Sequence, residues 1–291
     1  MIYEIHNDTL RVKIASVGAE LQSIQTADGA EYLWQGDPAY WTGHSPNIFP
    51  YVGRLTQGRY TLNGQEYGFK NHGLVRYEDL AVEEEASDTI TFRLDANEEL
   101  MKQYPYDFTY MITYTLKGNQ LIMTIQVENH SEERMFFAVG GHPGFNVPLE
   151  QGIAFEDYYL EFSEESHPYQ IEISPKGAIR SGQFLYQPEG GKRIHLQHNL
   201  FDSDAIVLYH GDRTVTLKSD QGARAVTVRY PDFRYIGFWH KPCTDAPYVC
   251  IEPWTSLPSR ENITEDFAQQ GDLLHIEGGE IWTTTWSIEI L

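Results

Sequence analysis

The chain has 291 residues, of which 41% are hydrophobic and 22% are charged, a balance typical of folded globular proteins rather than disordered ones. Its formal net charge of -21 argues against nucleic acid or an anionic membrane as a partner, because both bind basic surfaces. No stretch approaches the roughly 18 apolar residues of a membrane span, and the start lacks the basic and apolar regions of a signal peptide. We therefore expect a cytoplasmic protein whose two cysteines, Cys243 and Cys250, are reduced thiols.

Alternation of apolar and polar residues with period two, which is typical of half-buried strands, recurs through most of the chain. Two tight hairpin turns are predicted at Asn63-Gly64 and Gly118-Asn119, because these residues tolerate positive φ. In chain order, the pattern predicts strands or hairpins over residues 10–15, 60–67, 89–94, 108–127, 135–139, 225–230 and 248–251.

Helical periodicity is scarce. One short helix is predicted over residues 98–102, with Asp95 or Asn97 as its N-cap and Pro105 as its stop. No linker rich in Gly, Pro or Ser divides the chain, and no repeat of fixed period occurs. The sequence therefore predicts one all-β domain over residues 1–291, built from large antiparallel sheets in a sandwich or a barrel.

Three short segments each place one titratable side chain beside residues that shape a turn or offer an aromatic face. They are Asn71-His72-Gly73, the run from Gly140 to Asn146 with His142 at its centre, and Glu252 between an apolar strand and Pro253-Trp254. Two histidines and a partly desolvated glutamate could move protons in both directions near neutral pH. The alternatives are satisfied buried histidines and a strand-end glutamate held in an ion pair.

Arg54 follows Pro50 and Gly53 in a loop, where its guanidinium could hold hydroxyls or a carboxylate, or could form a structural ion pair. Cysteines and histidines, including His195 and His198, lack zinc-type spacing, so no metal site is expected. Phosphate loops of the Rossmann or Walker type and a Gly-x-Ser-x-Gly elbow are also missing.

Taken together, these segments resemble the aldose 1-epimerase (galactose mutarotase-like) family, and most closely its bacterial LacX-like branch. The matching segments are residues 50–54, 71–73, 141–146 and 251–253, in the expected order over nearly the whole chain. The resemblance implies a large antiparallel β-supersandwich with very few short helices. One departure concerns Pro143-Gly144-Phe145-Asn146, where the galactose-specific enzymes have a Tyr-Phe-Asn type sequence, which leaves galactose specificity open.

By this resemblance, Glu252 is expected to be the general base and His142 the general acid. For the substrate-holding aspartate, Asp204 is preferred to Asp202 because it better fits the apolar run that follows. The family's aromatic residue near the sugar would be Phe238 or Trp239. The residues expected to bind the substrate are therefore Asn71, Arg54, His72, Asp204, Phe238, Trp239 and Trp254.

The function implied is interconversion of the α and β anomers of a free hexose by acid–base ring opening and closure, without a cofactor. The expected partner is a small sugar, and the protein is expected to be a monomer or homodimer. One alternative is a hexose-6-phosphate 1-epimerase, for which Lys70, Arg76 and Lys241 could hold the phosphate. A non-catalytic sugar-binding or regulatory protein on the same fold is another. A glycoside hydrolase would need a second carboxylate in a setting like that of Glu252, which is not apparent.

Overall fold

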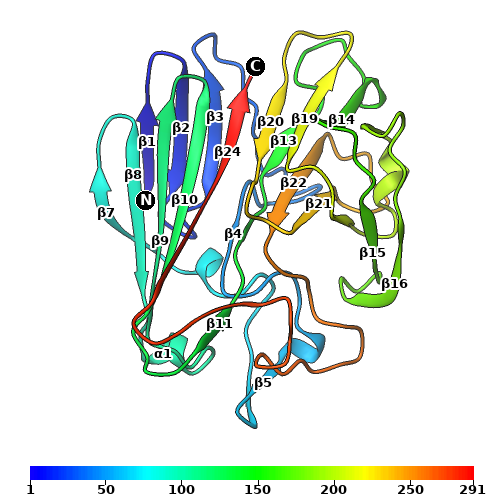
Figure 1. Cartoon of the computed structure of the whole chain (residues 1–291). Coiled ribbons are helices and arrows are strands. Elements are labelled where there is room, and N and C mark those ends of the chain that lie inside the picture. Colours follow the sequence, from blue (N-terminus) through cyan, green and yellow to red (C-terminus); the bar gives the residue numbers. More distant parts are fainter.

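Two broad antiparallel sheets dominate the fold of this computed structural model, which describes residues 1–291 (Figure 1). The first sheet has nine strands and runs across the whole width of the molecule. Its order is β17 (Arg193–His195), β14 (Tyr158–Phe162), β19 (Thr214–Ser219), β20 (Val226–Arg229), β24 (Ile281–Ile290), β10 (Gln120–Asn129), β9 (Phe108–Lys117), β8 (Thr89–Asp95) and β7 (Ala81–Glu85).

The second sheet has eight strands and covers one half of the first, next to β14, β19 and β20 (Figure 1). Its path is β16 (Ile179–Leu185), β15 (Tyr169–Ile173), β18 (Ile206–Tyr209), β21 (Tyr235–Trp239), β22 (Tyr248–Trp254), β12 (Gly140–Gly141) and β4 (Asn47–Ile48), with β13 (Gly144–Asn146) also paired to β22.

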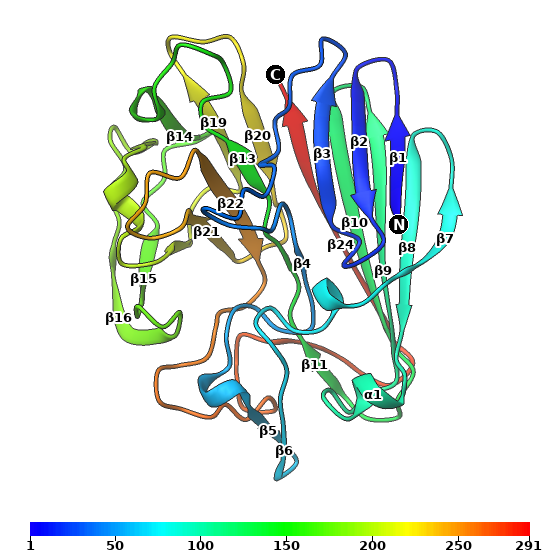
Figure 2. The same cartoon turned by 180° about the vertical axis from the view of Figure 1, so that it is seen from behind.

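A third sheet of β1 (Ile2–His6), β2 (Leu10–Ala15) and β3 (Leu21–Thr26) covers the other half, beside β8, β9 and β10 (Figure 2). Both smaller sheets lie on one face of the nine-stranded sheet. Tyr114 of β9 donates a hydrogen bond to Ala19 O between β2 and β3, and Trp286 of β24 lies against Gly141 of β12. The large antiparallel β-supersandwich expected from the sequence is thus confirmed.

Burial follows the alternation on which the predictions rest. Every second residue of β10 is buried, as in β2, and one core of 71 buried hydrophobic side chains includes residues from all three sheets.

The remaining strand pairs are β5 (Tyr60–Leu62) with β6 (Gln65–Tyr67), and β11 (Met135–Phe137) with β23 (Leu274–Ile276). The helices are α1 (Glu98–Met101) and 3-10 turns at Thr56–Gly58, Val75–Tyr77, Phe155–Asp157 and His198–Phe201. None of these helices has the length and apolar character to cross a membrane.

The predicted local signals are largely confirmed. Asn97 caps α1 by accepting hydrogen bonds from the backbone of Glu99 and Leu100. The turn between β5 and β6 has positive φ at both Asn63 and Gly64, whereas the turn between β9 and β10 has it only at Gly118. In the latter turn, the side chain of Asn119 instead donates to Ile290 O of β24.

Two predicted strand ends are wrong, and both bear on the site. The strand expected over 135–139 ends at Phe137, because Ala138 N then bonds to Pro50 O outside any strand. The strand expected over 248–251 continues to Trp254, so Glu252 lies within β22 rather than at its end. Pro253 is tolerated there because the regular pairing of β22 with the neighbouring segment is interrupted between Gly140 and Gly144.

Candidate active site

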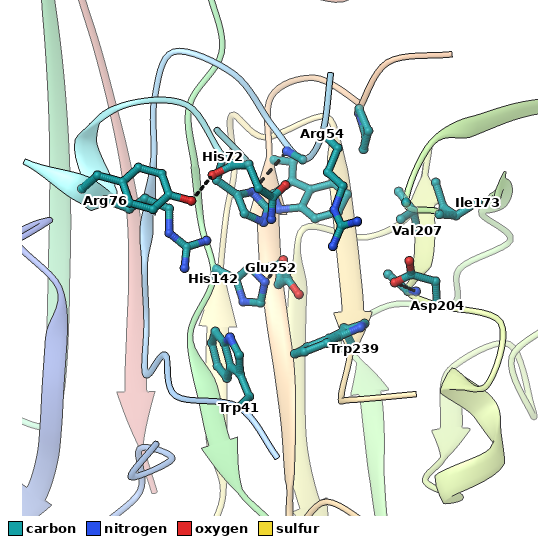
Figure 3. A pocket seen from close by; sticks show the side chains of 17 residues that line it. Trp41, Arg54, His72, Arg76, His142, Ile173, Asp204, Val207, Trp239 and Glu252 are labelled. Carbon is teal, nitrogen blue, oxygen red and sulfur yellow. Dashed lines mark hydrogen bonds and ion pairs between the residues drawn. The ribbon is translucent and has the colours of Figure 1, made fainter. Parts of the chain in front are cut away.

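A cavity of about 310 Å³ opens at the eight-stranded sheet and brings together side chains from segments far apart in the chain (Figure 3). It contains both expected histidines, the expected glutamate and two arginines. The lining residues are Trp41, Gly53, Arg54, Asn71, His72, Arg76, Tyr77, His142, Ile173, Gly177, Asp204, Ala205, Val207, Trp239, Glu252, Trp254 and Pro258.

His142 and Glu252 meet because they lie opposite each other across neighbouring antiparallel segments. Gly140 pairs with Trp254 and Gly144 pairs with Cys250, and the same register places residue 142 opposite residue 252. Directly opposed residues have Cβ atoms about 4.5–5.5 Å apart, so their side chains can touch. His142 Nε2 lies 3.2 Å from Glu252 Oε2. The pair therefore follows from strand register, and not from two loops that happen to converge.

The backbone at this point requires glycine. A Cβ added at Gly141 would lie 2.4 Å from the indole of Trp286, a buried side chain of the facing sheet. Residue 141 must therefore lack a side chain for the segment to lie this close to the facing sheet and present His142 to Glu252.

Burial shifts both members of the pair toward their neutral forms. His142 is 7% exposed and Glu252 is 1% exposed. Burial lowers the pKa of His142, and the positive charge of Arg76 lowers it further. Burial raises the pKa of Glu252 well above its usual value, and the negative charge of Asp204 raises it further. Burial thus favours the state in which the carboxyl group is protonated, the imidazole is neutral and the pair carries no net charge.

His72 lies on a tight turn of unusual backbone geometry. Its φ is 65°, in the left-handed region, and Gly73 follows with φ of 80°. A Cβ at Gly73 would lie 2.3 Å from Phe49 O, so only glycine fits. The Gly53 N–H donates to His72 Nδ1 at 3.1 Å, which leaves the ring hydrogen of the neutral imidazole on Nε2. Burial also lowers the pKa of His72, so this side chain serves as a neutral hydrogen-bond donor.

Asp204 and two arginines supply the remaining charges of the cavity. Asp204 precedes β18, and burial raises its pKa although the Ala205 N–H donates to its Oδ1. Arg54 approaches Asp204 beside Gly177, while Arg76 lies on the other side of the His142–Glu252 pair (Figure 3). The arginine ion pairs of the chain involve other guanidiniums, so Arg54 and Arg76 are both free to bind a ligand.

Three tryptophans line the cavity. Trp41 stacks on the His142 ring, with ring centroids 4.9 Å apart and an angle of 30° between the planes. Trp239 meets Trp41 edge to face at 5.6 Å, and both lie on one side of the acid–base pair (Figure 3). Trp254 leaves β22 on the same face as Glu252, because the two residues are separated by one. Such rings suit the C–H face of a sugar.

Most of the expected substrate-binding residues line this cavity, including Asn71, but Phe238 does not. Phe238 has no exposed surface and packs in the core near Phe162, because it alternates with Trp239 along β21 and points to the opposite face. Asp204 lines the cavity, whereas Asp202 accepts a hydrogen bond from Cys243 N outside it.

Of the basic residues considered for a phosphate, only Arg76 lines the cavity. The other two lie elsewhere: Lys70 is 5.0 Å from the centre of the Tyr77 ring, and Lys241 donates to Ala39 O.

Sequence reasoning missed Trp41, which lies in a loop of no evident motif, and the thiol of Cys250 beside Glu252. Ligand atoms of His142, Cys250 and Glu252 all lie within 4.8 Å of one another. The alternation around Cys250 and Glu252 does place both on one face, but their distance from His142 in sequence concealed the cluster.

Unpartnered polar atoms concentrate in this cavity. Six buried side-chain nitrogen or oxygen atoms of the chain have no hydrogen-bond partner, and four belong to residues that line the cavity. These four are Asn71 Oδ1, His142 Nδ1, Glu252 Oε2 and Trp254 Nε1. Because buried polar groups are almost always paired in folded proteins, this concentration indicates a binding site whose ligand supplies the partners.

Comparison with known proteins agrees with the fold. Residues 1–265 match the family model described as aldose 1-epimerase. Two LacX proteins of Lactococcus lactis subsp. lactis, one encoded on a plasmid and one on the chromosome, are 35% and 34% identical over 288 residues. Each alignment covers 95% of this chain and 96% of the relative.

Two solved structures extend the likeness to the whole backbone. A galactose mutarotase related enzyme from Lactobacillus acidophilus is 34% identical with a TM-score of 0.95, covering 100% of this chain and 97% of its own. A galactose mutarotase-like protein from Lactobacillus casei is 29% identical with a TM-score of 0.94, covering all of both chains. The fold thus defines an all-β protein of the galactose mutarotase-like class. The chain belongs to the aldose 1-epimerase family, whose members act on small sugars.

Proposed function

We propose that the chain is an active aldose 1-epimerase that interconverts the α and β anomers of a free hexose. Glu252 removes the proton of the anomeric hydroxyl while His142 protonates the ring oxygen, and the ring opens. Rotation of the carbonyl end followed by closure from the other face yields the other anomer and returns both protons. No redox step and no covalent enzyme intermediate is needed.

The 3.2 Å contact between His142 Nε2 and Glu252 Oε2 is the observation that carries this proposal. The anomeric hydroxyl and the ring oxygen are bonded to the same carbon, so the acid and the base that serve them must be neighbours. A glycoside hydrolase instead holds two carboxyl groups about 5 Å or more apart, on either side of the bond that breaks. An imidazole and a carboxyl group in contact suit the geminal oxygens of one sugar carbon.

A proton that passes between the two groups would let this buried pair act as both acid and base. Moving that proton from Glu252 to His142 converts the neutral pair into a carboxylate and an imidazolium without changing its net charge. Reaction in either direction then uses the same two groups with their roles exchanged, as an interconversion of two anomers requires. The cavity pays no desolvation cost for a net charge at any stage.

Neighbouring side chains would position the sugar. His72 offers an Nε2–H donor that can stabilise charge on the ring oxygen, and Arg54 and Asp204 can hold ring hydroxyls. The tryptophans would cover the C–H face of the ring. The four unpartnered polar atoms of the cavity match the many hydroxyl donors and acceptors of a sugar.

A second candidate, a phosphorylated hexose as substrate, is favoured by one observation. Arg54 and Arg76 both line the cavity, and neither guanidinium takes part in an ion pair. Arginine binds phosphate oxygens in a bidentate manner, so one of them could hold a phosphate while the acid–base chemistry stays the same. Rates on glucose and on glucose 6-phosphate separate the two substrates.

Polarimetry of anomer interconversion tests the proposal with Glu252→Gln and His142→Asn. Each variant should lose about 10²–10⁴-fold of the enzymatic rate, the usual contribution of positioned acid–base groups. The exposed pair of His195 and Glu189, whose atoms lie 2.9 Å apart, offers matched controls in His195→Asn and Glu189→Gln. These should keep the parental rate. Near-parental rates in a folded Glu252 or His142 variant would refute the role assignment, and a parental protein that binds sugars without accelerating interconversion would be a binding protein.

A further inference from the structure

The thiol of Cys250 has no part in the proposed proton transfers, yet it lies beside both groups that perform them. Cys250 precedes Glu252 by two positions in β22, so both side chains leave the same face of the strand. It has no exposed surface and forms no disulfide, and Cys243, the other cysteine, is exposed. Its strand partner is Gly144, which pairs with Cys250 in the segment that also carries His142.

The three side chains form a compact set of potential metal ligands. Ligand atoms of His142, Cys250 and Glu252 all lie within 4.8 Å of one another, and the His142 and Glu252 atoms are 3.2 Å apart. Zinc binds nitrogen and oxygen at about 2.0–2.2 Å and sulfur at about 2.3 Å, which sets tetrahedral ligand separations of about 3.4–3.6 Å. From a separation of at most 4.8 Å, the side chains therefore need to close by about 1.2–1.4 Å at most to reach that geometry.

The atoms around this set lack partners of their own. His142 Nδ1 and Glu252 Oε2 are buried without a hydrogen-bond partner, and their side chains are more than nine-tenths buried. A metal bound to Glu252 Oε2 would give that oxygen a partner, and a metal bound to His142 Nδ1 would do the same for that nitrogen. His142 and Glu252 also line the cavity, so an ion can reach them from there, and a water molecule in the cavity can complete four-coordination.

We propose that His142, Cys250 and Glu252 form a zinc site that inhibits the enzyme. A set of one nitrogen, one thiolate sulfur and one carboxylate oxygen suits Zn²⁺, whereas Mg²⁺ and Ca²⁺ prefer oxygen ligands alone. On binding, the ion replaces the thiol proton and the proton shared by His142 and Glu252, and both protons are released to solvent. The bound metal then occupies the two groups that would move protons, and it competes with the sugar. The inhibitory effect rests on the proposed function, but the binding does not.

Binding is tested first, on chelator-treated protein titrated with Co²⁺ and then with Zn²⁺. Cobalt bound to a thiolate gives a ligand-to-metal charge-transfer band in the near ultraviolet, which reports the Cys250 ligand without any assay of activity. Cys250→Ser should abolish this band and weaken zinc binding by at least about 100-fold, because loss of even an outer-shell partner of a metal costs about 10–100-fold. Cys243→Ser, the matched control at an exposed thiol, should leave both unchanged.

Other variants keep the test decisive if Cys250→Ser folds poorly. Glu252→Gln retains the thiol but removes a ligand, so it should weaken zinc binding while circular dichroism shows a folded chain. A missing charge-transfer band in the parental protein, or equal zinc affinity in the parent and a folded ligand variant, would overturn the site. Inhibition is tested with Zn²⁺ in the polarimetric assay: competition with sugar in the parent and its loss in Cys250→Ser are expected. Activation by zinc after chelation would overturn the inhibitory assignment.

Discussion

Replacement of Glu252 by glutamine should stabilise the folded protein while it removes activity. Glu252 is 1% exposed and its Oε2 has no hydrogen-bond partner, and burial raises the pKa of its carboxyl group. The unfolded chain ionises this group near pH 4.3. Between that pH and the folded-state pKa, the native state holds a proton that the unfolded state has lost, so the parental stability falls as the pH rises. Glutamine has a similar shape and does not titrate.

The difference in bound protons between the native and the unfolded state limits how much the stability gap between variant and parent can change with pH. One proton of difference corresponds to about 1.4 kcal/mol for each pH unit, so the stability advantage of Glu252→Gln should widen above pH 5 by up to about 1.4 kcal/mol per pH unit for as long as the native carboxyl group stays protonated. Below about pH 4.3 the carboxyl is protonated in both states, and this contribution disappears. Urea unfolding of parent and variant at several pH values measures the difference. A gap that stays constant from pH 5 to pH 8, or a variant that is less stable at pH 8, would contradict the assignment of a desolvated carboxyl group.

Two further substitutions test the groups that hold the pair in place. Trp41→Leu should raise KM through the lost sugar contact and should also lower kcat by about two- to tenfold, because its stacking on the acid imidazole is worth about 0.5–1.5 kcal/mol. Tyr40→Leu, on the same loop but outside the cavity, serves as the control, and a change confined to KM would argue that Trp41 only binds sugar. Gly73→Ala should cost about 1–3 kcal/mol more in urea unfolding than Gly64→Ala. Both glycines have positive φ, but only at residue 73 would the new Cβ meet a backbone oxygen at 2.3 Å, so equal costs would contradict the close approach.

Local sequence patterns predicted the sheets well because most strands are amphipathic. The alternation in residues 108–127 indicated a hairpin whose buried face follows directly from the pleat. The family resemblance left the sugar-facing aromatic residue open between Phe238 and Trp239, and alternation could not choose between them, because β21 is buried on both faces and has no polar side to set its phase. Strands buried on both faces are where sequence reasoning about a site is weakest.

The members of the candidate site were found from turn-forming and aromatic neighbours and from the family resemblance, not from their contacts. The register that places His142 opposite Glu252 joins segments more than a hundred positions apart, and no local pattern encodes it. Trp41 and Cys250 were missed for the same reason, since each matters only through a ring or carboxylate supplied by another part of the chain. Long-range register, rather than residue type, is what the structure adds.

A double-mutant cycle, measured on the rate of anomer interconversion, tests most directly whether the imidazole and the carboxyl group act as one catalytic unit. If they share a proton as proposed, then the variant carrying both His142→Asn and Glu252→Gln should be no slower than the slower single variant, because removing either member already disables the pair. Losses that multiply in the double variant would mean that the two side chains act independently, and would contradict the mechanism.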